Sequence, residues 1–299
     1  MSPDAATASE LGGLRHHGER LADRLPSLMV EADRVASTVA QGVHGRRRTG
    51  VGETFWQFRP YQQGDDAAEI DWRQSARSQH LFVREQEWEA AASVWLWCDL
   101  SPSMAFRSMK SIPSKRERAL VLTLALATLL VRGGERVALL GSGERPRAGR
   151  SALNHLVRGL GQAGRDAAGL MPEASLPRHA RVVIVSDFMQ PLAAIEQRLA
   201  RFVAHGARGT LLQVGDPAEE LLPYDGRVLF EGMEQDGQQL IGNVEVVRAR
   251  YRARYQAHRE TLARICTRQG WRFSAHRTDG SAEAGLLSLY QMLAPRMVT

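Results

Sequence analysis

The sequence has few cysteines and no long apolar run. Of 299 residues only Cys98 and Cys266 are cysteines, and they lie far apart. A disulfide framework and a thiolate zinc site both need a closer or more regular spacing. The longest apolar stretch, residues 119–131, has the length of a buried helix and is too short to span a bilayer. Because the N-terminus also lacks the order of a secretory signal, these absences predict a cytoplasmic protein without a membrane span.

Lysine is almost absent from the chain. Only Lys110 and Lys115 are lysines, although Lys and Arg together number 39 against 33 Asp and Glu, a net charge of +6. A basic balance raises the question of nucleic acid. The arginines are scattered, however, and only Arg46, Arg47 and Arg48 form a dense cluster, which suits phosphate contacts or a solvated loop equally well. Nucleic-acid binding is therefore an alternative hypothesis, not the leading one.

Several enzyme signatures are missing as well. No Gly-x-x-x-x-Gly-Lys-Ser/Thr sequence occurs, which argues against a P-loop ATPase. The histidines are not spaced as ligands of one ion, and no serine or cysteine has an evident base partner nearby. The sequence therefore gives no support to a P-loop ATPase, a histidine metal site or a serine or cysteine nucleophile.

The chain divides into three regions. Residues 1–44 carry apolar residues at helical spacing, which predicts amphipathic helices. Residues 45–90 are rich in glycine and aromatic residues and predict a β-rich segment packed on the main domain. In residues 91–299 apolar strands alternate with helices, as in a mostly parallel sheet. The predicted fold class is α/β, a doubly wound, Rossmann-like sheet with an N-terminal helical and β-rich extension.

The elements of the third region follow from its pattern of apolar residues. The expected strands are residues 93–98, 137–141, 181–186, 210–214 and 271–275. The expected helices are residues 116–131, 152–160, 192–204, 244–269 and 282–293. A hairpin insertion is expected near residues 222–243.

Polar residues follow two of these strands. Asp99, Ser101 and Ser103 come after residues 93–98, and residues two apart in an extended segment point the same way. Asp187 follows residues 181–186, so its carboxylate is expected at the same sheet edge, where open α/β sheets bind ligands. Carboxylates and hydroxyls suit Mg²⁺, or alternatively Mn²⁺ or Ca²⁺. The competing interpretation is a capped turn that opens the next helix.

These residues carry a resemblance to two known groups of proteins. Asp-x-Ser-x-Ser after one strand and Asp187 after another are similar to the metal-ion-dependent adhesion site of von Willebrand factor type A domains. The blocks Arg59 to Asp66, Ile70 to Trp72, Ser75 to Arg77 and Leu81 to Glu85 resemble the fingerprint of domain of unknown function fifty-eight, a bacterial and archaeal family. This second resemblance extends from residue 45 to the C-terminus.

The resemblance implies an interaction or adaptor protein, not a catalyst. Members of this family have a von Willebrand A-like half and commonly accompany MoxR-type AAA+ ATPases, so the implied partner is such an ATPase or its client. In the resembled site Ser101 and Ser103 would bind Mg²⁺ directly, Asp99 and Asp187 would act mainly through waters, and an acidic residue of the partner would complete the shell. The implied work is the assembly or maturation of client proteins.

The loop expected after the strand at residues 137–141 corresponds to a third loop of the resembled site, and it departs from that site in its residues. Adhesion sites usually take a threonine from this loop, but here only Ser142 or Ser151 is available to substitute. Arg145, Arg147 and Arg150 crowd the same loop. A guanidinium is therefore expected to compete with a metal ion for the carboxylates.

The fingerprint residues have a structural interpretation and a partner-binding one. Gly64 and Asp65 suit a turn, Trp72 suits a core position, and Asp71 and Arg77 suit a partly buried ion pair. The structural interpretation is favoured. The fingerprint residues singled out in this way are Arg59, Tyr61, Gly64, Asp65, Asp71, Trp72 and Arg77.

A phosphoryl-transfer enzyme with Asp99 as nucleophile is the alternative from another class. Aspartate-nucleophile phosphatases also place an aspartate at a strand end beside Mg²⁺. They carry a second acid two residues later, and here that position is Ser101, which cannot act as general acid and base. The sequence therefore favours the interaction protein over the phosphatase.

Overall fold

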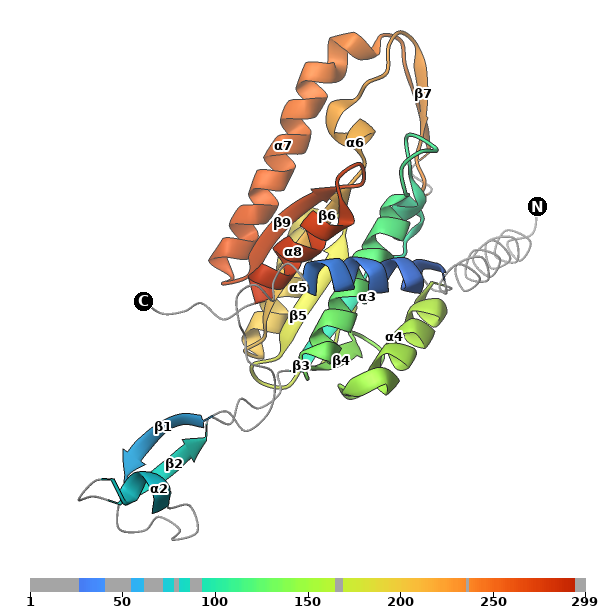
Figure 1. The fold of residues 1–299 in the computed structure, drawn as a ribbon. Coiled ribbons are helices and arrows are strands. Elements are labelled where there is room, and N and C mark those ends of the chain that lie inside the picture. The colour runs from blue at the N-terminus through green and yellow to red at the C-terminus, as the bar shows by residue number, and fades with distance from the viewer. Residues whose placement is uncertain are drawn as a thin grey trace, which may run out of the picture.

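The structure is a computed structural model that describes residues 27–40, 55–61, 72–77, 81–86, 93–164, 169–234 and 237–293. Its centre is a five-stranded parallel sheet (Figure 1). The strands are β3 (Ser93–Cys98), β4 (Arg136–Leu139), β5 (Arg181–Ser186), β6 (Arg208–Gly215) and β9 (Arg272–Arg277). The helices between them are α3 (Lys115–Arg132), α4 (Gly149–Ala163), α5 (Leu192–Ala204), α7 (Val244–Arg268) and, after β9, α8 (Ala282–Leu293). The mixed α/β class with a parallel central sheet is confirmed.

The order of the strands places the site. Across the sheet the order is β4-β3-β5-β6-β9, so the chain moves outward from β3 to β4 and then crosses back to β5 on the other side of β3. The carboxyl ends of β3 and β5 therefore flank the point where the winding direction reverses. Open α/β sheets bind ligands in the crevice at this point.

Apolar side chains alternate between the two faces of the sheet. Leu96 on β3 packs in one core cluster with α3, α4 and α8, while Trp95 and Trp97 pack in another with α5 and α7. This alternation follows the two-residue period of a strand. Helix α3 is buried along most of its length, which explains why the sequence there is apolar on nearly every side.

Two segments outside the sheet agree with the expected elements. A helix over residues 27–40 buries Leu28, Ala32 and Val35 in the α3 side of the core, as the helical spacing predicted. The rest of residues 1–44 lies outside the described residues. The expected insertion is present as the hairpin of β7 (Val228–Glu231) and β8 (Gln238–Ile241), which follows the short helix α6 (Pro217–Leu221).

The fingerprint segment forms a second hairpin. Strands β1 (Phe55–Pro60) and β2 (Phe82–Gln86) pair antiparallel, and the short helix α2 (Trp72–Ser75) lies between them in sequence. In Figure 1 this hairpin is drawn apart from the main domain, and neither core cluster contains any of its described residues. Packing of this segment on the main domain therefore stays a prediction.

Candidate functional site

The site lies in the loops that follow β3 and β5. The backbone N–H of Asp99 donates to the carbonyl of Val185 over 2.8 Å, so the segments that follow β3 and β5 begin side by side where they leave the sheet. The loop after β3 then turns through the short 3-10 helix η2 (Pro102–Ala105). Asp99 and Asp187 are therefore set side by side at the switch point, as the sequence predicted.

Asp99 is fully buried and bonded within the protein. Its Oδ1 accepts from the backbone N–H of Ser101 at 2.9 Å, and its Oδ2 accepts from the hydroxyl of Ser186 at 2.6 Å. Burial first, and then the charge of Asp187, raise the pKa of Asp99 to about 6, although these hydrogen bonds act in the opposite direction. Ser186, the last residue of β5, also accepts from the N–H of Phe188 at 3.0 Å.

The two predicted serines join this centre to Asp187. The hydroxyl of Ser103 donates to Asp187 Oδ2 over 2.9 Å and lies 3.2 Å from the hydroxyl of Ser101. The backbone N–H of Met189 donates to Asp187 Oδ1 over 3.2 Å. The four predicted residues Asp99, Ser101, Ser103 and Asp187 are thus brought together.

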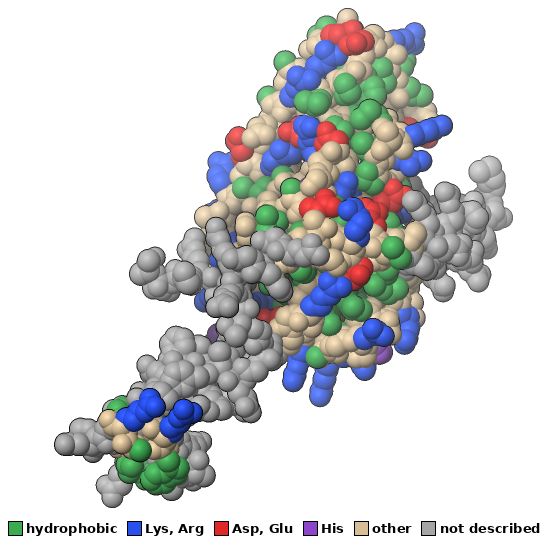
Figure 2. All heavy atoms as spheres, in the orientation of Figure 1, with side chains coloured by type: hydrophobic (Ala, Val, Ile, Leu, Met, Phe, Trp, Pro, Cys, Tyr) green, Lys and Arg blue, Asp and Glu red, His purple; other side chains and the backbone are tan. Residues whose placement is uncertain are grey.

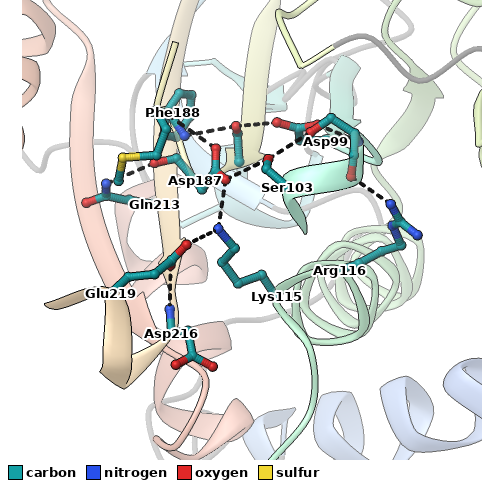
Figure 3. Close-up of polar contacts among 12 residues, drawn as sticks. Asp99, Ser103, Lys115, Arg116, Asp187, Phe188, Gln213, Asp216 and Glu219 are labelled. Atoms are coloured by element: carbon teal, nitrogen blue, oxygen red, sulfur yellow. Dashed lines mark hydrogen bonds and ion pairs between the residues drawn. The ribbon is translucent and has the colours of Figure 1, made fainter. Parts of the chain in front are cut away.

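Lys115 is one of three site residues, with Ser186 and Glu219, that the sequence did not predict. Figure 3 shows its side chain between Asp187 and Glu219. Lys115 Nζ lies 2.8 Å from Asp187 Oδ2 and 2.5 Å from Glu219 Oε1, and the lysine side chain is 1% exposed. Burial acts to lower the pKa of Lys115, but the two carboxylates outweigh it and hold the pKa above its ordinary value. The side chain is therefore an ammonium.

Local capping fixes the ends of the elements that carry this contact. Ser114 and Glu117 form a capping box, so Lys115 is the first residue of α3. A second capping box, between Asp216 and Glu219, starts α6 and positions the Glu219 side chain. We name the set Asp99, Ser101, Ser103, Lys115, Ser186, Asp187 and Glu219 the carboxyl-edge site.

Arg116, the next residue of α3, holds the other side of the site. Its guanidinium donates to the carbonyl of Leu100 at 2.8 Å and to the carbonyl of Ser101 at 2.6 Å. The first two residues of α3 therefore tie the loop after β3 to the loop after β5 (Figure 3).

The hydroxyls of the two third-loop serines bond carbonyls nearby in the chain. The hydroxyl of Ser142 donates to the carbonyl of Leu139 at 2.8 Å, and that of Ser151 donates to the carbonyl of Ala148 at 3.2 Å. Both serines are exposed, and so are the three arginines of the loop, Arg145, Arg147 and Arg150. The prediction that a guanidinium of this loop lies beside the carboxylates is therefore wrong. The cation beside Asp187 is the ammonium of Lys115.

These contacts test the fit of the implied metal ion. Ser142 and Ser151 use their hydroxyls to bond carbonyls nearby in the chain, and each oxygen of Asp99 and Asp187 accepts a hydrogen bond from within the protein. The ammonium of Lys115 also binds Asp187 Oδ2. The residues present do not fit a divalent ion held in the way that the resemblance implies, and the Mg²⁺ site stays a prediction.

The fingerprint residues lie away from the carboxyl-edge site in the chain. Arg59 is in β1, and the backbone N–H of Tyr61 donates to the carbonyl of Leu81. Gly64, Asp65 and Asp71 lie outside the described residues, so the turn and the ion pair stay predictions.

The core position expected for Trp72 is wrong. Its side chain is 65% exposed, and Arg77 is exposed too. Figure 2 shows hydrophobic side chains on the surface of this segment, where Leu81 is also 43% exposed. A segment of two short strands and one helical turn has too few residues to enclose a tryptophan.

The fold and the site define the class of protein as a doubly wound α/β protein with a polar site at its switch point. The chain belongs to DUF58, a protein family of unknown function, because the model of that family matches residues 57–261. This assignment confirms the family resemblance. Uncharacterized protein Rv1480 of Mycobacterium tuberculosis is 26% identical over 275 residues, which cover 87% of this chain and 86% of that protein, and uncharacterized protein Mb1516 of Mycobacterium bovis matches equally. These relatives neither assign an enzymatic activity nor exclude one.

Three solved structures are similar to this chain at lower sequence identity. An aerotolerance-related membrane protein from Bacteroides fragilis is 15% identical with a TM-score of 0.40, covering 68% of this chain and 98% of that chain. BatB from Bacteroides thetaiotaomicron is 14% identical with a TM-score of 0.38 and the same coverage. A membrane spanning protein from Vibrio fischeri is 18% identical with a TM-score of 0.18, covering 67% of this chain and 98% of that chain.

The predicted cytoplasmic location is contradicted by these names, because two of the three neighbours are described as membrane proteins. The prediction is withdrawn. Within the part of the chain that the structure describes, no helix is long and apolar enough to cross a membrane.

Proposed function

We propose that this DUF58 protein is a non-catalytic interaction protein that binds its partner at the carboxyl edge of the sheet. The observation that carries the proposal is a set of exposed apolar side chains on the loops around a polar centre that is bonded within the protein. Met109 before α3 is 50% exposed, Met189 after β5 is 41% exposed, and Leu221 at the end of α6 is 40% exposed. Exposed methionines adapt to many partner shapes and are typical of binding surfaces.

The polar centre supports binding over catalysis. Asp99 has no exposed surface, and both its oxygens accept hydrogen bonds from the protein. A nucleophile or general base needs to reach a substrate atom directly or through one water. A structural role for Asp99, which fixes the shape of the loop, is therefore favoured over the phosphoryl-transfer alternative.

The proposed partner is a MoxR-type AAA+ ATPase, or a client that it acts on in assembly or maturation. This choice rests on the family resemblance. The nucleic-acid alternative has less support, because Lys and Arg are interspersed with Asp and Glu on the face of the main domain shown in Figure 2. Arg46, Arg47 and Arg48 lie outside the described residues.

Binding between purified proteins tests the proposal. The full chain is immobilised, and a MoxR-type ATPase encoded in the same genome is titrated by biolayer interferometry. We expect Met189→Glu and Met109→Glu to weaken binding by about tenfold or more, because each places a charge in an apolar contact. Thr267→Glu, an exposed position in the last turn of α7 at the opposite end of the strands, is the control and retains binding. Equal binding by all four proteins would place the contact elsewhere.

A further inference from the structure

We infer that the cation of the carboxyl-edge site is the ammonium of Lys115, and that the site is complete without a divalent ion. The inference concerns the chain alone and does not depend on any partner. It replaces an exchangeable ion by a covalently attached one. The site is then permanently assembled, where a metal-dependent site would be switched by ion concentration.

The contacts place the ammonium at the centre of the acidic groups. Lys115 Nζ lies 2.8 Å from Asp187 Oδ2 and 2.5 Å from Glu219 Oε1. The same oxygen of Asp187 accepts from the hydroxyl of Ser103, one of the two serines that the resemblance assigns to the ion. The ammonium therefore shares its carboxylate with the predicted ligand set.

Burial makes these contacts obligatory for the lysine. The side chain of Lys115 is 1% exposed and that of Asp187 is not exposed at all. A buried charge is tolerated only where opposite charges or hydrogen bonds replace its lost hydration. A lysine at the first position of a helix is also unfavourable, because the helix N-terminus carries positive partial charge. Asp187 and Glu219 offset both costs, which accounts for the position of this side chain.

The choice of residue agrees with this role. The chain has two lysines and uses arginine for its other cationic side chains, yet one of the two lysines stands here. An ammonium is a compact charge that fits between two carboxylates, whereas a guanidinium is a wide planar fork. A divalent ion bound to Ser101, Ser103 and Asp187 would lie close to this ammonium in a water-poor site, where like charges repel strongly.

Metal binding by the purified full chain tests the inference. Wild type is titrated with MgCl₂ and with MnCl₂ by isothermal calorimetry, and its thermal unfolding is followed in millimolar MgCl₂ and in EDTA. We expect no saturable heat and a Tm that agrees within about 1 °C in the two solutions. A saturable heat together with a Tm that rises with Mg²⁺ and loses this rise in Asp187→Asn would overturn the inference.

Two lysine variants complete the test. Lys115→Met removes the ammonium at similar length, and Lys110→Met removes the other, exposed lysine as a matched control. We expect Lys115→Met to have the lower Tm and to gain stabilisation by Mg²⁺, because Asp187 and Glu219 then lack a cation. If Lys115→Met is as stable as Lys110→Met, the lysine is not the cation of the site. Should Lys115→Met fail to fold, the wild-type calorimetry decides by itself.

Discussion

Lys115 and Asp187, 72 positions apart in the chain, form an ion pair in which neither side chain has appreciable solvent exposure. The pair joins the first residue of α3 to the loop after β5 at the switch point of the sheet. Glu219 on α6 completes the cluster from a third segment. A site of this kind fixes the relative positions of three loops, and those loops carry the exposed apolar residues proposed to bind a partner.

Removal of the lysine charge is expected to be costly. Loss of one member of a buried ion pair leaves an unpaired charge, so Lys115→Met should reduce the free energy of unfolding by about 3–5 kcal/mol. Lys110→Met should change it by less than about 0.5 kcal/mol, because Lys110 is exposed. Urea denaturation followed by circular dichroism measures both. Since Asp187→Asn removes the charge left behind, the double variant should lose less stability than the two single variants together; simple additivity would show that the two side chains are not coupled.

Ser186 is expected to matter through two hydrogen bonds. Its hydroxyl donates to Asp99 Oδ2 and accepts from the N–H of Phe188. Ser186→Ala leaves both buried groups without this partner and should cost about 1–3 kcal/mol of the free energy of unfolding. Ser151→Ala serves as the control, because its exposed hydroxyl bonds only the carbonyl of Ala148. Equal stability of the two variants in urea denaturation would contradict the described network.

His276 is expected to make stability depend on pH. Burial, and then the charge of Arg118, lower the pKa of His276 from 6.5 to about 4. Between these two pKa values the unfolded chain binds a proton at His276 that the folded chain does not bind. The stability that depends on a neutral His276 is therefore fully present above pH 6.5 and is lost as the pH falls to about 4. It amounts to about 3 kcal/mol at most.

The contribution of His276 is measured as a difference between two proteins. Urea unfolding of wild type and His276→Gln is compared at pH 7 and pH 4.5. The wild type should lose more stability than the variant across this interval. An exposed-histidine control, His205→Gln, should behave like wild type. Parallel losses in wild type and His276→Gln would refute the assignment.

Trp72 is expected to contribute little to folding. Because its side chain is 65% exposed, Trp72→Ala should change the free energy of unfolding by less than about 0.5 kcal/mol. A larger loss would show that the tryptophan is packed in the protein. The same variant in the ATPase titration shows whether the fingerprint segment also contacts the partner.

The sequence was most informative where burial and alternation leave a pattern. Residues 93–98 and 181–186 are apolar runs that are each followed directly by an aspartate, and parallel strands bring such ends to one edge of the sheet. Asp99, Ser101, Ser103 and Asp187 were therefore predictable as neighbours. Their hydrogen bonds confirm the placement.

Contacts between distant segments left no such pattern. Lys115 stands at the start of a helix, where a solvated lysine has the same local sequence, and its two carboxylates are 72 and 104 positions away. Ser142 was available as a third-loop ligand by composition, but its hydroxyl bonds the carbonyl three residues before it. Trp72 has the apolar character of a core residue, but its side chain is 65% exposed.

Hydrogen exchange with and without the partner tests the central claim most directly. The full chain alone and mixed with the proposed partner, a MoxR-type ATPase, is labelled in deuterated water, and the backbone amides are analysed by mass spectrometry. The account predicts that protection on complex formation is largest in residues 106–113, 188–192 and 217–222, the segments at the carboxyl edge of the sheet. Protection confined to the last turns of α5 and α7, at the opposite end of the strands, would contradict it.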